Sequence, residues 1–166
     1  MKIIVLYDTR FGNTERIAKS LETGLKEASD IQDVVCINAK DLLIASLKEY
    51  DLVCIGAPTE GFTASKSIKE LLAKLRGIEL VGEYGFAFDT KLDSRLSGSA
   101  AKFIEKELSN QGLIIIARRE SAIVFSVKDK GVITDARLKE GEEERFRKIG
   151  TELGRSLAAK ISMIRG

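Results

Sequence analysis

Apolar residues follow two different spacings along the chain. Short runs that are rich in β-branched residues and free of polar interruption are typical of strands buried on both faces of a parallel sheet. These runs occupy residues 3–7, 34–37, 51–56, 84–88 and 113–117.

Between these runs, apolar residues recur every three or four positions, which is the spacing of amphipathic helices. We expect the first helix to end within 30–33 and Asp41 to cap the second, which is short. The predicted helices begin near residues 13, 41, 67, 97 or 99, and 142.

The regular alternation of strand and helix predicts the α/β class, with a parallel sheet, right-handed crossovers and helices on both faces. No repeat or interdomain linker interrupts the pattern, so residues 1–166 are expected to form a single domain. The least regular segment is 118–137, where apolar residues flank the polar stretch 128–131. We expect a hairpin or an extended excursion there, at the edge of the sheet.

The turn 9–14, with the sequence Thr-Arg-Phe-Gly-Asn-Thr, lies between the first strand and the first helix. It brings two hydroxyls, an amide and a glycine to a helix end whose first N–H groups have no partner, which favours a phosphate. The alternative is that Thr9, Asn13 and Thr14 only cap the helix. The turn lacks the glycine spacing of nucleotide-triphosphate and dinucleotide loops, and it lacks the cysteine of a thiol phosphatase.

Two further polar segments follow the third and fourth strands, at 58–63 and 89–98. The first contains Pro58, the only proline of the chain, which fixes the path by which the backbone leaves the sheet. Because ligands of parallel sheets bind beyond the carboxyl ends of the strands, we expect all three segments to meet at one rim.

Composition narrows the possible functions. The chain has 27 basic and 25 acidic residues, a formal charge of +2, and no basic stripe interleaved with aromatics, so we expect no nucleic-acid partner. No histidine is present, and two cysteines cannot build a zinc or iron–sulfur site, so no metal is expected. No stretch approaches the roughly 18 apolar residues of a membrane span, and no signal peptide precedes the first strand. We therefore expect a cytoplasmic protein with no membrane partner.

Two motifs at the predicted strand ends resemble those of the flavodoxin superfamily. The turn 9–14 is similar to its phosphate loop, Ser/Thr-x-x-Gly-Asn-Thr, and Gly56-Ala57-Pro58-Thr59 is similar to the Gly-Ala/Ser-Pro-Thr that follows its third strand. The resemblance covers the whole chain in order and length. It implies a five-stranded, doubly wound parallel sheet with strand order 2-1-3-4-5 and noncovalent flavin mononucleotide (FMN) as cofactor.

The same resemblance implies that the turn 9–14 holds the FMN phosphate and that the ring lies between the segments 58–63 and 89–98. Phe62 and Phe11 are the only aromatics of these loops, and either stacking on the ring or packing against the adjacent helix would explain them. Asp89 and Asp93 could bond the ring edge or ribose, but capping and turn formation would explain them equally well. The residues expected at the FMN site are Thr9, Arg10, Phe11, Gly12, Asn13, Thr14, Pro58, Thr59, Glu60, Gly61, Phe62, Asp89, Thr90 and Asp93.

Three functions are compatible with these motifs, and we favour the first. The first is an electron carrier that passes one or two electrons between redox partner proteins. The second is a small FMN-dependent reductase of quinone-type acceptors. The third is a flavin-free module that works by protein contact, an alternative suggested by the small number of aromatic residues.

Cys36 and Cys54 fall inside predicted strands, where a cysteine usually acts as a small buried hydrophobe. With the implied strand order they lie two strand spacings apart, about 10 Å, beyond the reach of a disulfide. We expect two free thiols.

Overall fold

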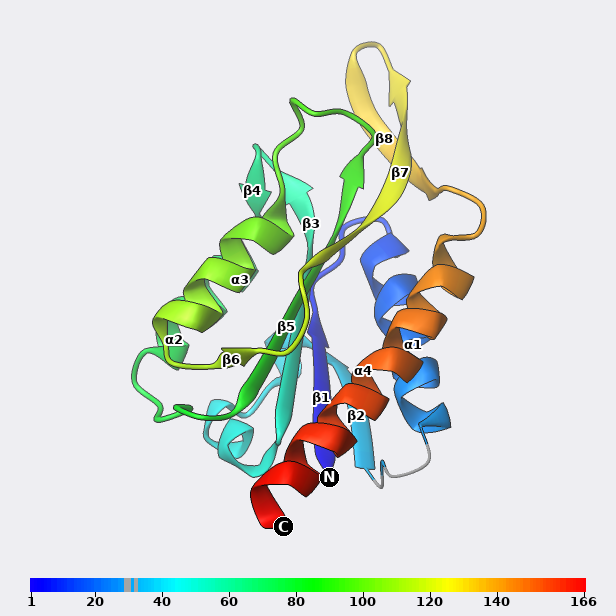
Figure 1. Ribbon diagram of the computed structural model, residues 1–166. Coiled ribbons are helices and arrows are strands. Elements are labelled where there is room, and N and C mark those ends of the chain that lie inside the picture. The colour runs from blue at the N-terminus through cyan, green and yellow to red at the C-terminus, as the bar shows by residue number, and fades with distance from the viewer. Residues whose placement is uncertain (29–30, 32) are drawn as a thin grey trace.

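The computed structural model describes residues 1–166 except 29, 30 and 32. Within these residues, a mostly parallel sheet runs in the order β2-β1-β3-β5-β7-β8, with β4 beside β3 and β6 beside β5 (Figure 1). This confirms the α/β class and the strand order 2-1-3-4-5, although the strands are more numerous than predicted. The strands are β1 Lys2–Tyr7, β2 Asp33–Asn38, β3 Leu52–Glu60, β4 Thr63–Ala64, β5 Tyr84–Leu92, β6 Ile114–Ile115, β7 Glu120–Asp129 and β8 Val132–Leu138.

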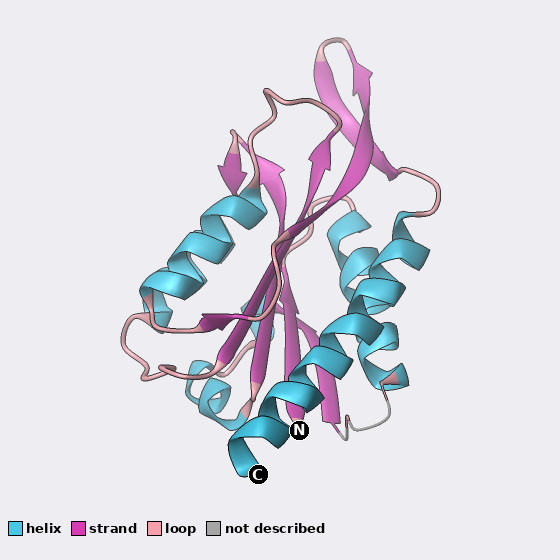
Figure 2. Ribbon diagram, in the orientation of Figure 1, coloured by secondary structure: helices cyan, strands magenta, loops and turns pink. Residues whose placement is uncertain are grey.

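Helices cover both faces of the sheet (Figure 2). The helices α2 and α3 pack on one face, and α1 and α4 pack on the other. Strand β1 serves both layers, because Ile4 and Leu6 point into the first core while Ile3 and Val5 point into the second. The helices are α1 Asn13–Glu27, α2 Lys66–Leu75, α3 Ala100–Asn110 and α4 Glu142–Arg165, with short 3₁₀ helices η1 Ala39–Asp41 and η2 Ile44–Glu49.

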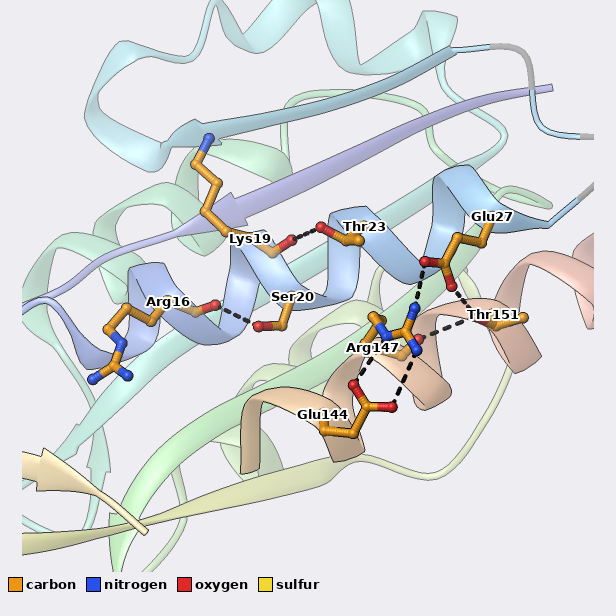
Figure 3. A network of polar contacts seen from close by, with 8 residues as sticks. All are labelled: Arg16, Lys19, Ser20, Thr23, Glu27, Glu144, Arg147 and Thr151. Atoms are coloured by element: carbon orange, nitrogen blue, oxygen red, sulfur yellow. Dashed lines mark hydrogen bonds and ion pairs between the residues drawn. The ribbon is translucent and has the colours of Figure 1, made fainter. Parts of the chain in front are cut away.

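The helices α1 and α4 lie side by side and are joined by charged residues (Figure 3). Arg147 of α4 donates to Glu27 of α1, with Nη1 2.6 Å from Oε1, and its Nε lies 3.0 Å from Oε2 of Glu144. Exposed pairs of this kind contribute little free energy each. The apolar side chains of α1 and α4, which are fully buried at Leu21 and Phe146, carry most of this packing.

Strands β3 and β5 continue beyond the predicted ends, so Pro58 and Asp89 lie in strands and not in loops. The β1–β3 ladder ends at the pair Tyr7–Gly56, whereas the β3–β5 ladder continues to the pair Pro58–Thr90. Because Pro58 lies beyond the last pair with β1, its missing N–H removes no bond on that side. The polar residues that predict loops after residues 56 and 88 instead lie in the last part of β3 and β5.

The predicted fifth strand, 113–117, is shorter than expected. Only Ile114–Ile115 forms a strand, β6, which pairs with the start of β5, and the ladder along β5 resumes at Glu120 in β7, beyond the predicted range. Between β6 and β7, Arg119 contacts α3. Its backbone N–H and its Nη1 donate to the carboxylate of Glu105 at 2.9 and 2.8 Å. The pattern of apolar residues contains no sign of this interruption.

The segment 118–137 forms the expected hairpin: β7 and β8 pair antiparallel and extend past the carboxyl ends of the other strands (Figure 1). The capping prediction for Asp41 is wrong. Asn38 accepts the N–H of Lys40 and starts η1, while Asp41 is its last residue. The first helix ends at Glu27, and the predicted ending within 30–33 lies partly outside the described residues.

Cys36 and Cys54 both pair with Val5, from opposite sides of β1, and both are free thiols as expected. Cys54 is fully buried, whereas Cys36 is only partly so. Burial raises the pKa of Cys36 to about 12, so its thiol is protonated at neutral pH. No helix among the described residues is long and apolar enough to cross a membrane.

Candidate functional site at the carboxyl ends of the strands

The turn 9–14 shapes itself with local bonds and leaves the start of α1 open. Gly12 has φ 85°, a left-handed conformation that glycine adopts without strain. Its N–H donates to Oγ1 of Thr9 at 2.9 Å, and the N–H of Thr9 donates to Oδ1 of Asp8 at 2.9 Å. None of the described side chains caps α1, so the capping alternative does not hold for this helix. In the described part of the chain, the N–H groups of Asn13–Glu15 have no acceptor, which provides three donors for an anion.

The side chains of the turn connect it to distant strands. Thr14 is buried, and its hydroxyl lies 2.9 Å from the hydroxyl of Thr90 in β5. The amide of Asn13 donates to the carbonyl of Ala136 in β8 at 2.7 Å. Arg10 places its guanidinium 4.8 Å from the ring centre of its neighbour Phe11. The turn is thus fixed against both the centre of the sheet and the hairpin.

Asp89 is a fully buried carboxylate at the end of β5. Its Oδ2 accepts hydrogen bonds from Ser99 Oγ at 2.7 Å, the N–H of Ala101 at 2.9 Å and Thr59 Oγ1 at 3.2 Å. Thr59 in turn accepts the N–H of Ala100 at 3.0 Å. These contacts favour the capping interpretation of Asp89, which holds the start of α3 and the end of β3 together.

The turn between β3 and β4 has an uncommon backbone conformation. Gly61 and Phe62 have φ 52° and 70°, the two positive values of a type I′ hairpin turn. A bulky residue at positive φ is a strained position. Phe62 is 70% exposed, so it does not pack against the adjacent helix. Its backbone rests on Gly98, where a Cβ atom would lie 2.2 Å from the Phe62 carbonyl oxygen.

Two neighbouring cavities occupy this rim of the sheet. The first, of about 110 Å³, is bounded by the turn 9–14, by the ends of β3 and β5, and by the hairpin. The second, of about 320 Å³, is bounded by the β3–β4 turn and the loop after β5. They share the residues Arg10, Thr59, Glu60, Leu92 and Ile133. The three polar segments therefore meet at one rim, as the sequence predicted.

The predicted residues do not all lie at the cavities. Asp89 and Asp93 line neither of the two, and Gly12 shapes the turn without lining them. The predicted residues in the first cavity are Thr9, Arg10, Phe11, Asn13, Thr14, Pro58, Thr59, Glu60 and Thr90; Gly61 and Phe62 lie in the second.

The sequence did not indicate that the hairpin contributes to the site. Its inward-facing residues Val124, Ser126, Ile133 and Ala136 line the first cavity, together with Lys91 of β5. The sequence carries no alternating pattern there, because Ala122, Ile123, Val124 and Phe125 are all apolar although only Ala122 and Val124 are buried.

The fold and the site define a doubly wound α/β protein with a donor-rich turn where the strand order reverses, between β1 and β3, which is where such sheets bind their ligands. Comparison with known proteins agrees. The family model described as Flavodoxin matches residues 5–149, and the chain belongs to that family.

Individual relatives give the same picture. A flavodoxin from Clostridium saccharobutylicum is 29% identical over 158 residues, which cover 92% of this chain and 95% of the relative. The type A flavoprotein fprA of Rhodobacter capsulatus is 29% identical over 118 residues, which cover 67% of this chain but 25% of that longer protein. A solved flavodoxin from the domain Archaea has a TM-score of 0.76 at 20% identity and covers 95% of this chain and 99% of its own. As a flavodoxin, this chain is an FMN-binding electron-transfer protein.

Proposed function

We propose that the turn 9–14 holds the phosphate of FMN and that the flavin ring lies in the second cavity, between the β3–β4 turn and the loop after β5. The observation that supports this most is the set of donors at the start of α1: the N–H groups of Asn13–Glu15, the hydroxyl of Thr14 and the guanidinium of Arg10. Charge-assisted bonds of this kind contribute about 1.5–3 kcal/mol each.

The second cavity suits a planar ring. Its volume of about 320 Å³ is within the range of about 300–1,000 Å³ usual for ligand pockets. Leu92 and Ile133 give it an apolar wall, and Phe62 stands exposed at its rim. When bound, FMN supplies the one- and two-electron redox chemistry. The chain supplies the donors, the walls and a β3–β4 turn that contains Gly61 next to the ring position.

We propose a carrier of electrons between proteins in preference to a reductase of small acceptors. Among the residues that the structure describes, the only carboxylate lining the second cavity is the exposed Glu60, and they offer no buried acid or base there for proton transfer to a substrate. The exposed apolar side chains of Phe62 and Leu92, 70% and 37% accessible, give a protein partner a surface to approach. A cytoplasmic location is part of this proposal, supported by the two free thiols.

The test combines two measurements on the whole chain. The purified protein is incubated with FMN, desalted and examined by absorption, and a yellow protein with bound flavin is expected. Turnover of reduced nicotinamide with quinones is then measured with and without an added flavodoxin reductase. Negligible turnover without the reductase supports the carrier. Rapid turnover without it would support the quinone reductase, and a colourless protein would support the flavin-free module.

A further inference from the structure

An irregularity in the hairpin decides which way Ile133 points. Ser126 of β7 lies opposite Ala136 of β8, and both line the first cavity. Strict alternation back along β8 from Ala136 would turn Thr134 inward and Ile133 outward. The register shifts between Val127 and Lys128, however, and leaves Thr134 without a partner residue across the ladder. This β-bulge turns Ile133 to the inner face, and bulges often re-aim a side chain in this way.

The position of Ile133 is unusual within the hairpin. It is the only hairpin residue that lines both described cavities. Its neighbour Val132 points away and is 64% exposed. Ile133 therefore stands on the boundary that the two neighbouring cavities share, and Leu92 of β5 lines the same two cavities.

The hairpin is held over the cavity at two points. In β8, the carbonyl of Ala136 accepts the amide of Asn13 from the turn 9–14 at 2.7 Å. At its base, the buried carboxylate of Glu142 accepts the N–H of Ile123 at 2.8 Å, and Arg145 bridges Glu142 to Glu120 at 2.9–3.0 Å. These bonds come from the start of α1, which borders the first cavity, and from the start of α4.

We propose that Ile133 is an affinity-determining residue of the flavin site, and that its side chain closes an apolar wall over the junction between the ribityl chain and the ring. This inference rests on the proposed placement of FMN. The loop 93–98 after β5 contains no aromatic residue, so the apolar cover on this side comes from aliphatic side chains, of which the hairpin contributes Ile133. Burial of such a side chain against a ligand is favourable without any specific geometry.

The test compares Ile133→Ala with Val132→Ala, two truncations of neighbouring residues on opposite faces of β8. Dissociation constants for FMN are measured by flavin fluorescence. Ile133→Ala is expected to weaken binding about tenfold, as the loss of a partly buried aliphatic side chain implies, and Val132→Ala is expected to leave it unchanged. Thermal melts of the apo variants show whether both are folded. If Ile133→Ala is not folded, Ile133→Val takes its place, with an intermediate loss of FMN affinity expected.

A second measurement uses the unmodified chain. Hydrogen exchange of the amides in 132–138 is followed with and without FMN, and slower exchange with FMN is expected. Equal FMN affinity of Ile133→Ala, Val132→Ala and the unmodified chain, or exchange that FMN does not slow, would overturn the role of Ile133 and leave the proposed function intact. An unmodified chain that binds no FMN would overturn both.

Discussion

The turn 9–14 and the β7–β8 hairpin both line the first cavity, yet they are built in different ways. The turn is formed by near neighbours, because Gly12 bonds Thr9 and the helix α1 starts at the next residue. The hairpin reaches the cavity through contacts between residues far apart in the sequence, such as Asn13 with Ala136. A binding wall made of local contacts leaves a motif in the sequence, and one made of distant contacts does not.

This difference explains how much could be predicted. The strand order, both helix layers and most of the residues at the cavities follow from apolar spacing and from two motifs whose residues are adjacent in the chain. The role of Ile133 depends on the unpaired Thr134, and the extension of β5 to Leu92 depends on partners for Asp89 that come from α3. The bulge depends on the register of β8 against Val127 and Lys128, and the residues that bond Asp89 lie 10 and 12 positions further along the chain, so neither feature could be inferred from spacing.

The largest expected effect is a loss of stability that is greater for a substitution at the rim of the second cavity than for the same substitution at the tip of the hairpin. Gly98 and Gly131 both have positive φ, 72° and 80°. A Cβ at Gly98 would lie 2.2 Å from the Phe62 carbonyl oxygen, whereas one at Gly131 meets nothing within 4 Å. Gly98→Ala should therefore lower the free energy of unfolding by about 3 kcal/mol, from conformation and overlap together, and Gly131→Ala by about 1 kcal/mol. Urea unfolding of both variants measures this, and equal losses would contradict the contact between Gly98 and Phe62.

Thr14→Val tests the turn 9–14 as the phosphate site. The substitution keeps the side-chain volume in a buried position but removes the hydroxyl. FMN affinity should fall about 10- to 100-fold, as the loss of one charge-assisted bond implies. Thr23→Val is the matched control, because its hydroxyl only bonds the carbonyl of Lys19 on the exposed face of the same helix. Fluorescence titration should show no change for the control, and similar losses for both variants would mean that the hydroxyl of Thr14 has no part in binding.

Glu142→Gln tests how the base of the hairpin is held. Burial alone would raise the pKa of Glu142, but the hydrogen bonds from Arg145 and from the Ile123 N–H outweigh it and lower the pKa below the ordinary 4.5. Because the pKa is lower in the folded state, the carboxylate stabilises the protein above pH 4.5, and this contribution is lost as the pH falls through the folded value.

The variant should thus lose about 1–2 kcal/mol of unfolding free energy at pH 7, and its stability should change less than that of the unmodified chain as the pH falls through 4.5 and below. Glu144→Gln, at an exposed position in the same helical turn, is the control and should change stability little. Urea unfolding at several pH values gives both results. A pH dependence that Glu142→Gln leaves unaltered would show that this carboxylate does not hold the hairpin.

The central claim is that the start of α1 binds the phosphate of the flavin. The most direct measurement compares the dissociation constants of the unmodified chain for FMN and for riboflavin, which has the same ring and ribityl chain but no phosphate. Two or more charge-assisted bonds predict that FMN binds at least about 100-fold more tightly, with the difference shrinking as salt is added. Equal affinity for the two flavins would contradict the claim.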